Sequence, residues 1–146
     1  MPGQECSAAI AEDLPSKLTA KLRMQLPAPD AIYSSFVEMD QEFIASTSCG
    51  AGSTANLFLW DPSNYIGHMA NTGDTRSVLC RAGIAVDLTR DQKATDPDEI
   101  VRISKAGGFV SGGRVLGLLA VARAFGDSSL KTESAPNAVT AGQFYM

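Results

Sequence analysis

The sequence predicts an α+β fold in which antiparallel strands are covered by helices. Two segments near the N-terminus carry apolar residues at helical spacing, and a series of short apolar runs follows them. Only a few turn-forming residues separate these runs, so the strands must be antiparallel, because parallel pairs need a long crossover. A further helical pattern comes after the runs. This order is typical of a sheet layer with helices packed on it.

The first helical segment covers residues 4–14, which are rich in helix formers. We expect Pro15 to end this helix or to begin a new turn, because proline lacks the N–H that a helix interior needs. Three leucines then recur at helical spacing and predict one buried stripe. They are Leu18, Leu22 and Leu26.

A second and clearer amphipathic helix follows Pro27 and Pro29. Asp30 has the character of an N-cap, and the pattern continues to about Ala45. Acidic and amide side chains separate its apolar positions. Those positions are Ile32, Tyr33, Phe36, Val37, Met39, Phe43 and Ile44.

Four strands are expected next, at residues 54–60, 65–70, 76–80 and 85–88. A third helix then begins with Asp96 as its cap and Pro97 at its first position, and it ends near Gly107 or Gly108. Its apolar face should consist of Ile100, Ile103 and Val101.

The apolar pattern of residues 109–127 predicts one or two more strands or a short helix. We expect the mixed, polar tail at about 128–146 to be poorly ordered. Residues 1–146 make about one domain's worth of chain, so we treat them as a single, partial domain.

The composition argues against several classes of partner. A net charge of −4 and the lack of any lysine or arginine run disfavour a nucleic-acid partner. We expect no membrane partner either, because the longest apolar run is far below the ~18–20 residues that cross a bilayer. The three cysteines form no C-x-x-C pair, which favours reduced thiols over a zinc or disulfide framework. With no signal peptide visible, we expect a cytoplasmic or nuclear location.

Asp74 lies in a short turn between two apolar runs. An aspartate there can satisfy its own backbone, or it can be an oxygen ligand for magnesium or manganese, and the residues leave both possibilities open. One carboxylate cannot form a metal centre alone, because two-metal hydrolases need several bridging acids.

Arg123 is a basic residue inside an apolar run and therefore requires an anionic partner. The partner is either an internal carboxylate such as Asp127 or a ligand phosphate. His68, the only histidine, is expected to be packed or on the surface rather than catalytic. The glycines of residues 107–114 are expected to serve tight turns, because the Lys-Ser/Thr ending of a phosphate-binding loop is missing.

A series of short motifs resembles one known family in both order and spacing. "GSTA", "GDTRSVL", "LTRDQK", "PDEIVRI", "GGFV", "RVLG" and "LAVARAFGD" follow one another between residues 50 and 130. They are similar to the central motifs of the metal-dependent protein phosphatases of type 2C. The resemblance extends upstream to residues 3–18, where Gly3 matches the last glycine of that family's D-G-H-G-G motif.

The resemblance implies a fold, a reaction and site residues. It implies two antiparallel sheets packed face to face with helix pairs outside, incomplete here at both ends. It implies Mg- or Mn-dependent hydrolysis of phosphoserine or phosphothreonine in a phosphoprotein substrate. Asp74 matches the aspartate that some members use for a third, weakly held metal, and Arg123 matches the arginine of the S-R-A-x-G-D motif, where it has a possible supporting role. No other catalytic or cofactor-binding residue is carried over.

The chain also departs from the family pattern. Gln92 stands where the family has histidine in D-H-K, Leu116 where asparagine is frequent, and Ala122 where serine is usual. Met1 and Pro2 replace part of D-G-H-G-G, and the sequence stops before the family's A-C-D-G and D-N motifs, which carry the remaining metal aspartates.

Two interpretations follow, either a phosphatase domain or a truncated pseudo-phosphatase that at most binds a protein partner. We expect negligible turnover and no stably held metal from these residues alone. We also expect low stability and self-association through open sheet edges and open helix faces such as that of Leu18, Leu22 and Leu26.

Overall fold

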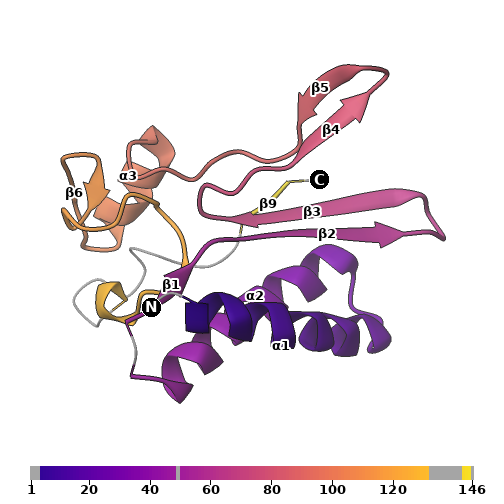
Figure 1. Ribbon diagram of the computed structural model, residues 1–146, viewed down its shortest axis with the longest axis horizontal. Helices are drawn as coiled ribbons and strands as arrows, with labels where there is room; N and C mark the ends of the chain where they lie inside the picture. The colour runs from indigo at the N-terminus through magenta and orange to yellow at the C-terminus, as the bar shows by residue number, and fades with distance from the viewer. Residues whose placement is uncertain (1–3, 49, 132–142, 146) are drawn as a thin grey trace.

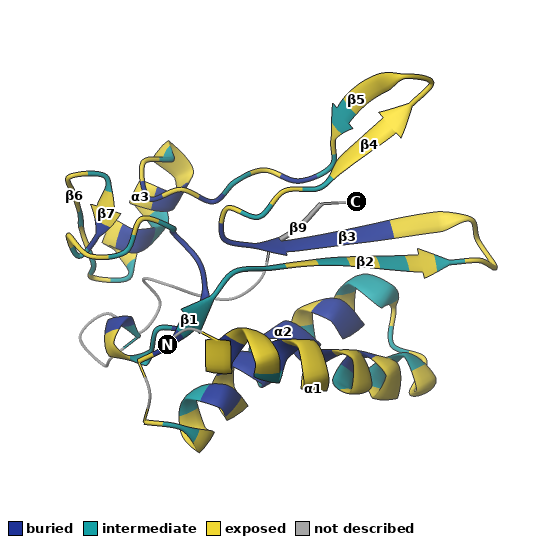
Figure 2. Ribbon diagram, viewed as in Figure 1, coloured by how far each residue is buried: buried dark blue, intermediate teal, exposed yellow. Residues whose placement is uncertain are grey.

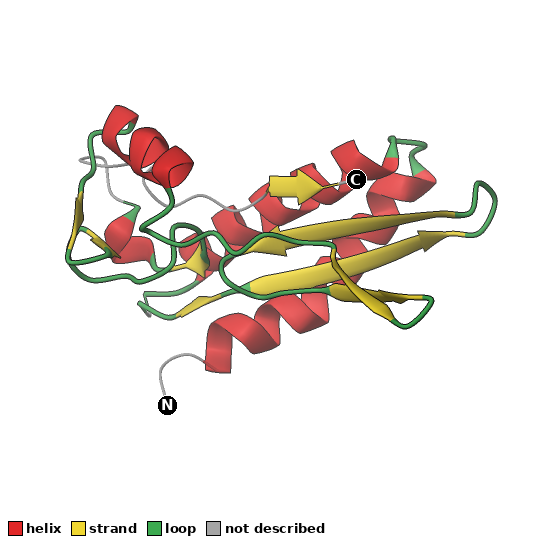
Figure 3. Cartoon of the chain, turned by 90° about the horizontal axis from the view of Figure 1, so that it is seen from above, coloured by secondary structure: helices red, strands yellow, loops and turns green. Residues whose placement is uncertain are grey.

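The computed structural model describes residues 4–48 and 50–131, together with the backbone of residues 143–145. Helices pack on one face of a small sheet, and a second hairpin stands over its other face (Figures 1 and 3). In chain order the elements are α1 (Gln4–Arg23), α2 (Ala28–Ser46), β1 (Gly52–Ser53), β2 (Ala55–Asp61), β3 (Ile66–Thr72), β4 (Val78–Arg81), β5 (Ile84–Asp87), α3 (Pro97–Lys105), β6 (Val110–Ser111), β7 (Arg114–Val115), β8 (Phe125–Gly126), the 3-10 helix η1 (Ser128–Leu130) and β9 (Gln143–Tyr145). The predicted α+β class is confirmed.

Helix α1 continues through Pro15, so the prediction that this proline ends the helix is wrong. Proline in a helix interior costs about 3 kcal/mol. Side chains at four-residue spacing on both sides of it are buried against α2 and the sheet, and each buried isoleucine or leucine contributes about 1.5–3 kcal/mol. Their combined burial outweighs the proline. They are Cys6, Ile10, Leu14 and Leu18.

The leucine stripe is covered rather than open. Leu18 is 6% exposed, and Leu22 and Leu26 pack against the same core. The expectation of an open helix face is therefore wrong at Leu18, whereas Leu22 and Leu26 are half-buried at the edge of the core between α1 and α2.

Helix α2 begins three residues earlier than predicted. Its N-cap is Pro27, and Asp30 lies in the first turn, where a carboxylate is favourable beside the positive end of the helix dipole. A proline in the first turn is tolerated because the N–H it lacks has no partner within the helix.

Strands β2 and β3 form an antiparallel hairpin in which Ala55 pairs with Thr72 and Asp61 pairs with Ile66. The carboxylate of Asp61 accepts hydrogen bonds from the backbone N–H of Ser63 at 2.9 Å and the side-chain amide of Asn64 at 2.7 Å, which fixes the turn. The Asn64 bond lowers the pKa of Asp61.

The two faces of this hairpin differ in environment. Leu57 and Leu59 pack against the helical core. On the opposite face Phe58 is 61% exposed and Trp60 49% exposed. Figure 2 shows β3 buried toward its C-terminal end and exposed toward the hairpin tip. The outer face of this hairpin is therefore an exposed apolar surface, whereas its inner face belongs to the core.

All strand pairs in the described part of the chain are antiparallel, as predicted. Strands β4 and β5 are joined through Ala82 and Gly83, whose φ angles of 51° and 82° are those of a tight hairpin turn. Strand β9 pairs with β3, and β1 pairs with β8, far away in sequence. The remainder of the predicted tail, residues 132–142 and 146, lies outside the described residues.

Helix α3 begins as predicted, with Asp96 at its N-cap and Pro97 at its first position. Of its three expected apolar contacts only Ile103 is buried, whereas Ile100 and Val101 are 38% and 53% exposed. Ile103 belongs to a second, smaller core with Ala94, Val115, Ala122, Ala124 and Leu130.

No helix within residues 4–48 and 50–131 is both long and apolar enough to cross a bilayer.

Candidate functional site

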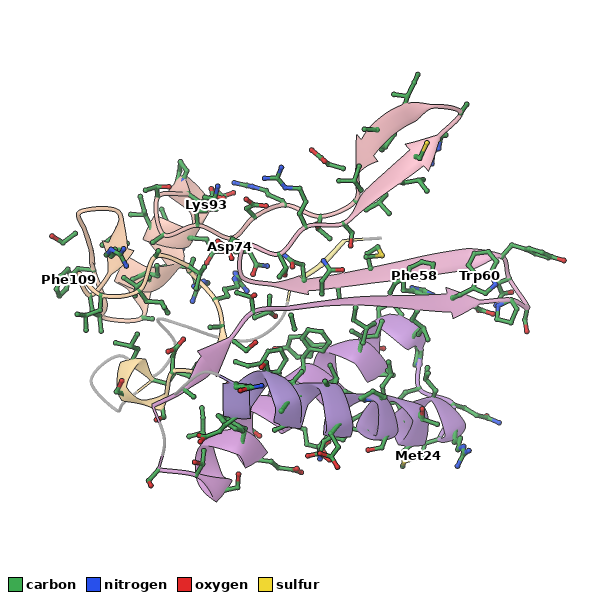
Figure 4. All side chains as sticks on the ribbon, in the orientation of Figure 1. Met24, Phe58, Trp60, Asp74, Lys93 and Phe109 are labelled. Carbon is green, nitrogen blue, oxygen red and sulfur yellow. The ribbon has the colours of Figure 1, made fainter. Side chains whose placement is uncertain are left out.

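Asp74 lies in the turn that follows β3, at the end of the sheet opposite Phe58 and Trp60 (Figure 4). Its side chain is exposed. The carboxylate makes no hydrogen bond or ion pair with any residue that the structure describes. The turn-stabilising role that the sequence left open is therefore not visible, and the carboxylate is available to a ligand.

Gly73, immediately before Asp74, presses this turn against a neighbouring segment. Its φ of +93° favours glycine, and a Cβ there would lie 2.2 Å from Cγ2 of Thr54 and 3.1 Å from the carbonyl oxygen of Arg123. No larger residue fits without a shift of the backbone. The turn of Asp74 and the segment of Arg123 are thus in contact.

Two buried amide side chains hold the turn from the other side. Oε1 of Gln92 accepts a hydrogen bond from the N–H of Gly73 at 2.8 Å, and the N–H of Gln92 donates to the Gly73 carbonyl at 2.9 Å. Nδ2 of Asn71 donates to the same carbonyl at 3.1 Å and to that of Arg90 at 3.2 Å. Gln92 is 2% exposed and Asn71 is fully buried, so water does not compete for these bonds.

Arg76 and Asp91 form an outer clamp between the same two segments. The guanidinium donates from Nε at 3.0 Å and from its terminal nitrogen at 2.9 Å to the two carboxylate oxygens. Lys93 lies 3.2 Å from the same carboxylate. The pair lowers the pKa of Asp91 and raises that of Arg76. A bidentate pair adds geometric specificity to this contact.

Arg123 is buried and pairs with Glu99 on α3. Its Nε donates to one carboxylate oxygen of Glu99 at 2.9 Å. Nε of Arg102 donates to the other at 2.7 Å, and the Arg102 guanidinium also donates to the Ala122 carbonyl at 2.7 Å. Burial lowers the pKa of Arg102, and Glu99 opposes that effect. The predicted carboxylate partner exists, but it is Glu99 rather than Asp127.

Asp127 directly follows β8, and its N–H donates to the carbonyl of Ala51, next to β1. Its carboxylate occupies the space that a Cβ at Gly52 would need, because the nearest carboxylate oxygen lies 2.2 Å from that point. The neighbouring Asp40 accepts hydrogen bonds from the Gly126 N–H at 2.8 Å and from Lys131 at 2.7 Å. Burial raises the pKa of Asp127; Lys131 opposes this shift and Asp40 adds to it.

A polar cleft of about 300 Å³ lies between α3 and the segment of Gln92. Three arginines line it together with four acidic side chains, so the lining has no excess of positive charge for a phosphate. The charged residues are Arg90, Arg102, Arg123, Asp91, Asp96, Asp98 and Glu99. The arginines already pair with these acids.

The described residues fit a metal ion only in part. Asp74 can supply one carboxylate oxygen to Mg²⁺ or Mn²⁺, which prefer such ligands. No group of three or more histidine, cysteine, aspartate or glutamate side chains comes together among residues 4–48 and 50–131. Asp74 can thus supply one ligand, and this part of the chain does not bring together the others that a metal centre needs.

The histidine, glycines and cysteines that the sequence analysis considered lie away from the turn of Asp74 or serve the fold. His68 is 8% exposed on β3, and its Nδ1 has no hydrogen-bond partner among the residues that the structure describes. Gly112 and Gly113, with φ of 58° and 73°, form the tight turn between β6 and β7, as expected in place of a phosphate-binding loop. Cys6 is buried and Cys80 exposed, both as free thiols.

An apolar cavity of about 660 Å³ lies between the outer face of β2–β3 and the β4–β5 hairpin. Phe58, Trp60 and Tyr65 contribute to its apolar lining. It is separate from the turn of Asp74, which lies at the other end of β3 (Figure 4).

Comparison with known proteins identifies the class of protein that this fold and turn define. A family description, Protein phosphatase 2C, matches residues 1–142. The chain belongs to the protein phosphatase 2C family. The resemblance inferred from the motifs is therefore confirmed.

Relatives with curated names agree with this assignment. The chain is 46% identical over 98 residues to Protein phosphatase 2C 37 of Arabidopsis thaliana, with 64% of this chain and 24% of that protein covered. It is 37% identical over 135 residues to Probable protein phosphatase 2C 59 of the same plant, with 88% and 43% covered. The chain thus spans less than half of the length of these relatives.

Solved structures share the fold. A C. elegans sex determining protein has a TM-score of 0.84 at 26% identity, with 99% of this chain and 37% of that chain covered. A phosphatase from Toxoplasma gondii has a TM-score of 0.76 at 21% identity, with 99% and 61% covered. The helices and antiparallel strands described here thus form a partial phosphatase 2C fold.

Sequence reasoning missed the residues that hold the site in place. Glu99, in the first turn of α3, is not among the candidates that the sequence predicts, although it is 4% exposed. Gln92 was noted only as a departure from a family motif. The one available signal was the apolar environment of Arg123, which requires a buried acid nearby.

Proposed function

We propose that this chain forms part of a protein serine/threonine phosphatase that depends on Mg²⁺ or Mn²⁺, with Asp74 as one metal ligand. The family match over residues 1–142 carries the proposal. The exposed Asp74 carboxylate on a tightly held turn supports it. When bound, the metal would supply an activated water that attacks the phosphate ester of a phosphoserine or phosphothreonine.

The described residues hold and orient the ligand. Gly73 fixes the backbone next to Asp74, and the segment of Arg123 lies directly behind it. Arg123 supports the site through its pair with Glu99, which ties α3 to this segment. In this role Arg123 positions the scaffold and does not contact the substrate.

The proposal also covers the substrate class, the cellular location and the self-association of the chain. A phosphoprotein in the cytoplasm or nucleus is the substrate class we infer. The exposed face of Phe58 and Trp60 supports self-association of the isolated chain, which concentration-dependent sedimentation would measure.

The activity is best tested in a chimera. The segment of the Arabidopsis relative that matches 88% of this chain would be replaced by the matching residues of this chain. We expect release of phosphate from a phosphothreonine peptide that requires Mn²⁺, stops on addition of EDTA, and falls in an Asp74→Asn chimera. The unaltered relative serves as the reference, and the isolated chain is assayed in parallel.

A folded chimera without Mn²⁺-dependent release, beside an active reference, would refute the proposal. That outcome would leave the non-catalytic interpretation. An Asp98→Asn chimera is a matched control, since Asp98 is an exposed aspartate outside the turn and its loss should leave the rate unchanged.

A further inference from the structure

Gln92 joins the turn that carries Asp74 to the segment that carries Arg123. Its carboxamide and backbone N–H both bond to Gly73, directly before Asp74. Its own carbonyl accepts a hydrogen bond from the N–H of Ala122 at 2.7 Å, directly before Arg123. One residue thus bridges the two segments that the motif resemblance singled out.

Both the oxygen and the nitrogen of the Gln92 carboxamide form hydrogen bonds. Oε1 accepts from the Gly73 N–H, and Nε2 donates to the carbonyl of Asn71 at 3.3 Å. A buried amide with both groups paired holds its partners in one arrangement, because every alternative leaves a buried polar group without a partner. The peptide groups on both sides of the turn are therefore fixed.

We propose that Gln92 is a positioning residue for the metal ligand Asp74, a role that rests on the function proposed above. The direction of the Asp74 side chain depends on the two peptides before it. The Gln92 carboxamide holds the Thr72–Gly73 peptide through the N–H of Gly73, and the Gln92 backbone N–H holds the Gly73–Asp74 peptide through the Gly73 carbonyl. Residues that hydrogen-bond to a metal ligand without touching the metal have a strong effect on metal affinity. Their loss costs about 10–100-fold in metal binding or activity.

The family's histidine at this position gives the proposal a rescue variant. An imidazole nitrogen can accept the Gly73 N–H in place of Oε1, so Gln92→His keeps the acceptor. Methionine has nearly the length of glutamine and no hydrogen-bonding amide, so Gln92→Met removes the interaction while it fills the same space. A residue that only fills the core would tolerate methionine at least as well as histidine.

The test is an NMR titration of the full chain with Mn²⁺ alone. Paramagnetic broadening of the Asp74 and Thr75 amide signals reports Mn²⁺ at the turn, and Asp74→Asn gives the background from other carboxylates. Exchange of the Gly73 amide hydrogen reports whether its bond to Gln92 is intact. The signals next to Asp98, an exposed aspartate on α3, serve as an internal control.

We expect Gln92→Met to raise the Mn²⁺ concentration for half-broadening at Asp74 about 10-fold and to speed Gly73 exchange, with no change at Asp98. Gln92→His should restore both. An unchanged half-broadening concentration in Gln92→Met, with faster Gly73 exchange, would overturn the positioning role and leave the proposed function intact. Wild-type broadening equal to that of Asp74→Asn would remove Asp74 as a ligand and overturn both. If Gln92→Met does not fold, Gln92→Asn, which withdraws the amide by one methylene, is judged by the same outcomes.

Discussion

The buried cluster around Glu99 gives the sharpest prediction of stability. Glu99 is 4% exposed and Arg123 is 7% exposed, and they are joined at 2.9 Å. Glu99→Gln removes the negative charge but keeps the shape, so the Arg123 guanidinium remains buried without its anion. Breaking a buried ion pair in this way costs about 3–5 kcal/mol.

Urea denaturation followed by circular dichroism measures this effect. With a slope of about 2 kcal/mol per molar urea, the expected loss corresponds to a midpoint lower by about 1.5–2.5 M. Asp98→Asn is the control one residue away, where the side chain is 85% exposed and lies 3.4 Å from Arg90. Exposed pairs contribute little, so its free energy of unfolding should change by less than about 1 kcal/mol.

A double-mutant cycle isolates the pair itself. Glu99→Gln combined with Arg123→Gln should cost less than the sum of the two single changes, by about 1–3 kcal/mol, because the second change removes the orphaned charge. If Glu99→Gln costs no more than Asp98→Asn, the assignment of Glu99 as the buried counter-ion is refuted.

Three further outcomes are expected from the same denaturation assay. Gly73→Ala should destabilise the chain more than Gly83→Ala, since both have positive φ but only at Gly73 would the added Cβ meet a neighbouring methyl group, at 2.2 Å; equal losses would contradict the contact. Phe125→Ala, at a fully buried ring, should lower the free energy of unfolding by about 3–5 kcal/mol. Phe109→Ala, at a ring 56% exposed, should lower it much less. A reversed order would argue against the described core. Burial raises the pKa of Asp127 above its ordinary value of 3.8, so the folded chain binds more protons between 3.8 and that raised value, and the free energy of unfolding falls as the pH rises through this window. Asp127→Asn should remove this fall, and a difference between wild type and variant that does not vary with pH would count against it.

Predictions from short sequence patterns were confirmed where residues close together in the sequence decide the local structure. The antiparallel order of the strands and the start of α3 at Asp96 follow from turn residues and capping, which act over a few positions. The two apolar runs and the turn residues between them likewise placed Asp74 in a turn after a strand, where the structure has it.

Predictions were wrong where distant partners compete with local preference. Pro15 does not end α1, because the side chains before and after it are buried on one face against α2. Asp30 does not cap α2, since the helix already begins at Ala28.

The sequence by itself determined the fold class, the family and the position of a single candidate metal ligand, because these depend on periodicity and on short motifs in order. Only the tertiary structure decided which groups meet behind that ligand. Glu99 reaches Arg123 across 24 positions and Gln92 reaches Gly73 across 19. The physical reason is that buried charges and amides must find partners wherever packing brings them, and packing is a property of the whole chain.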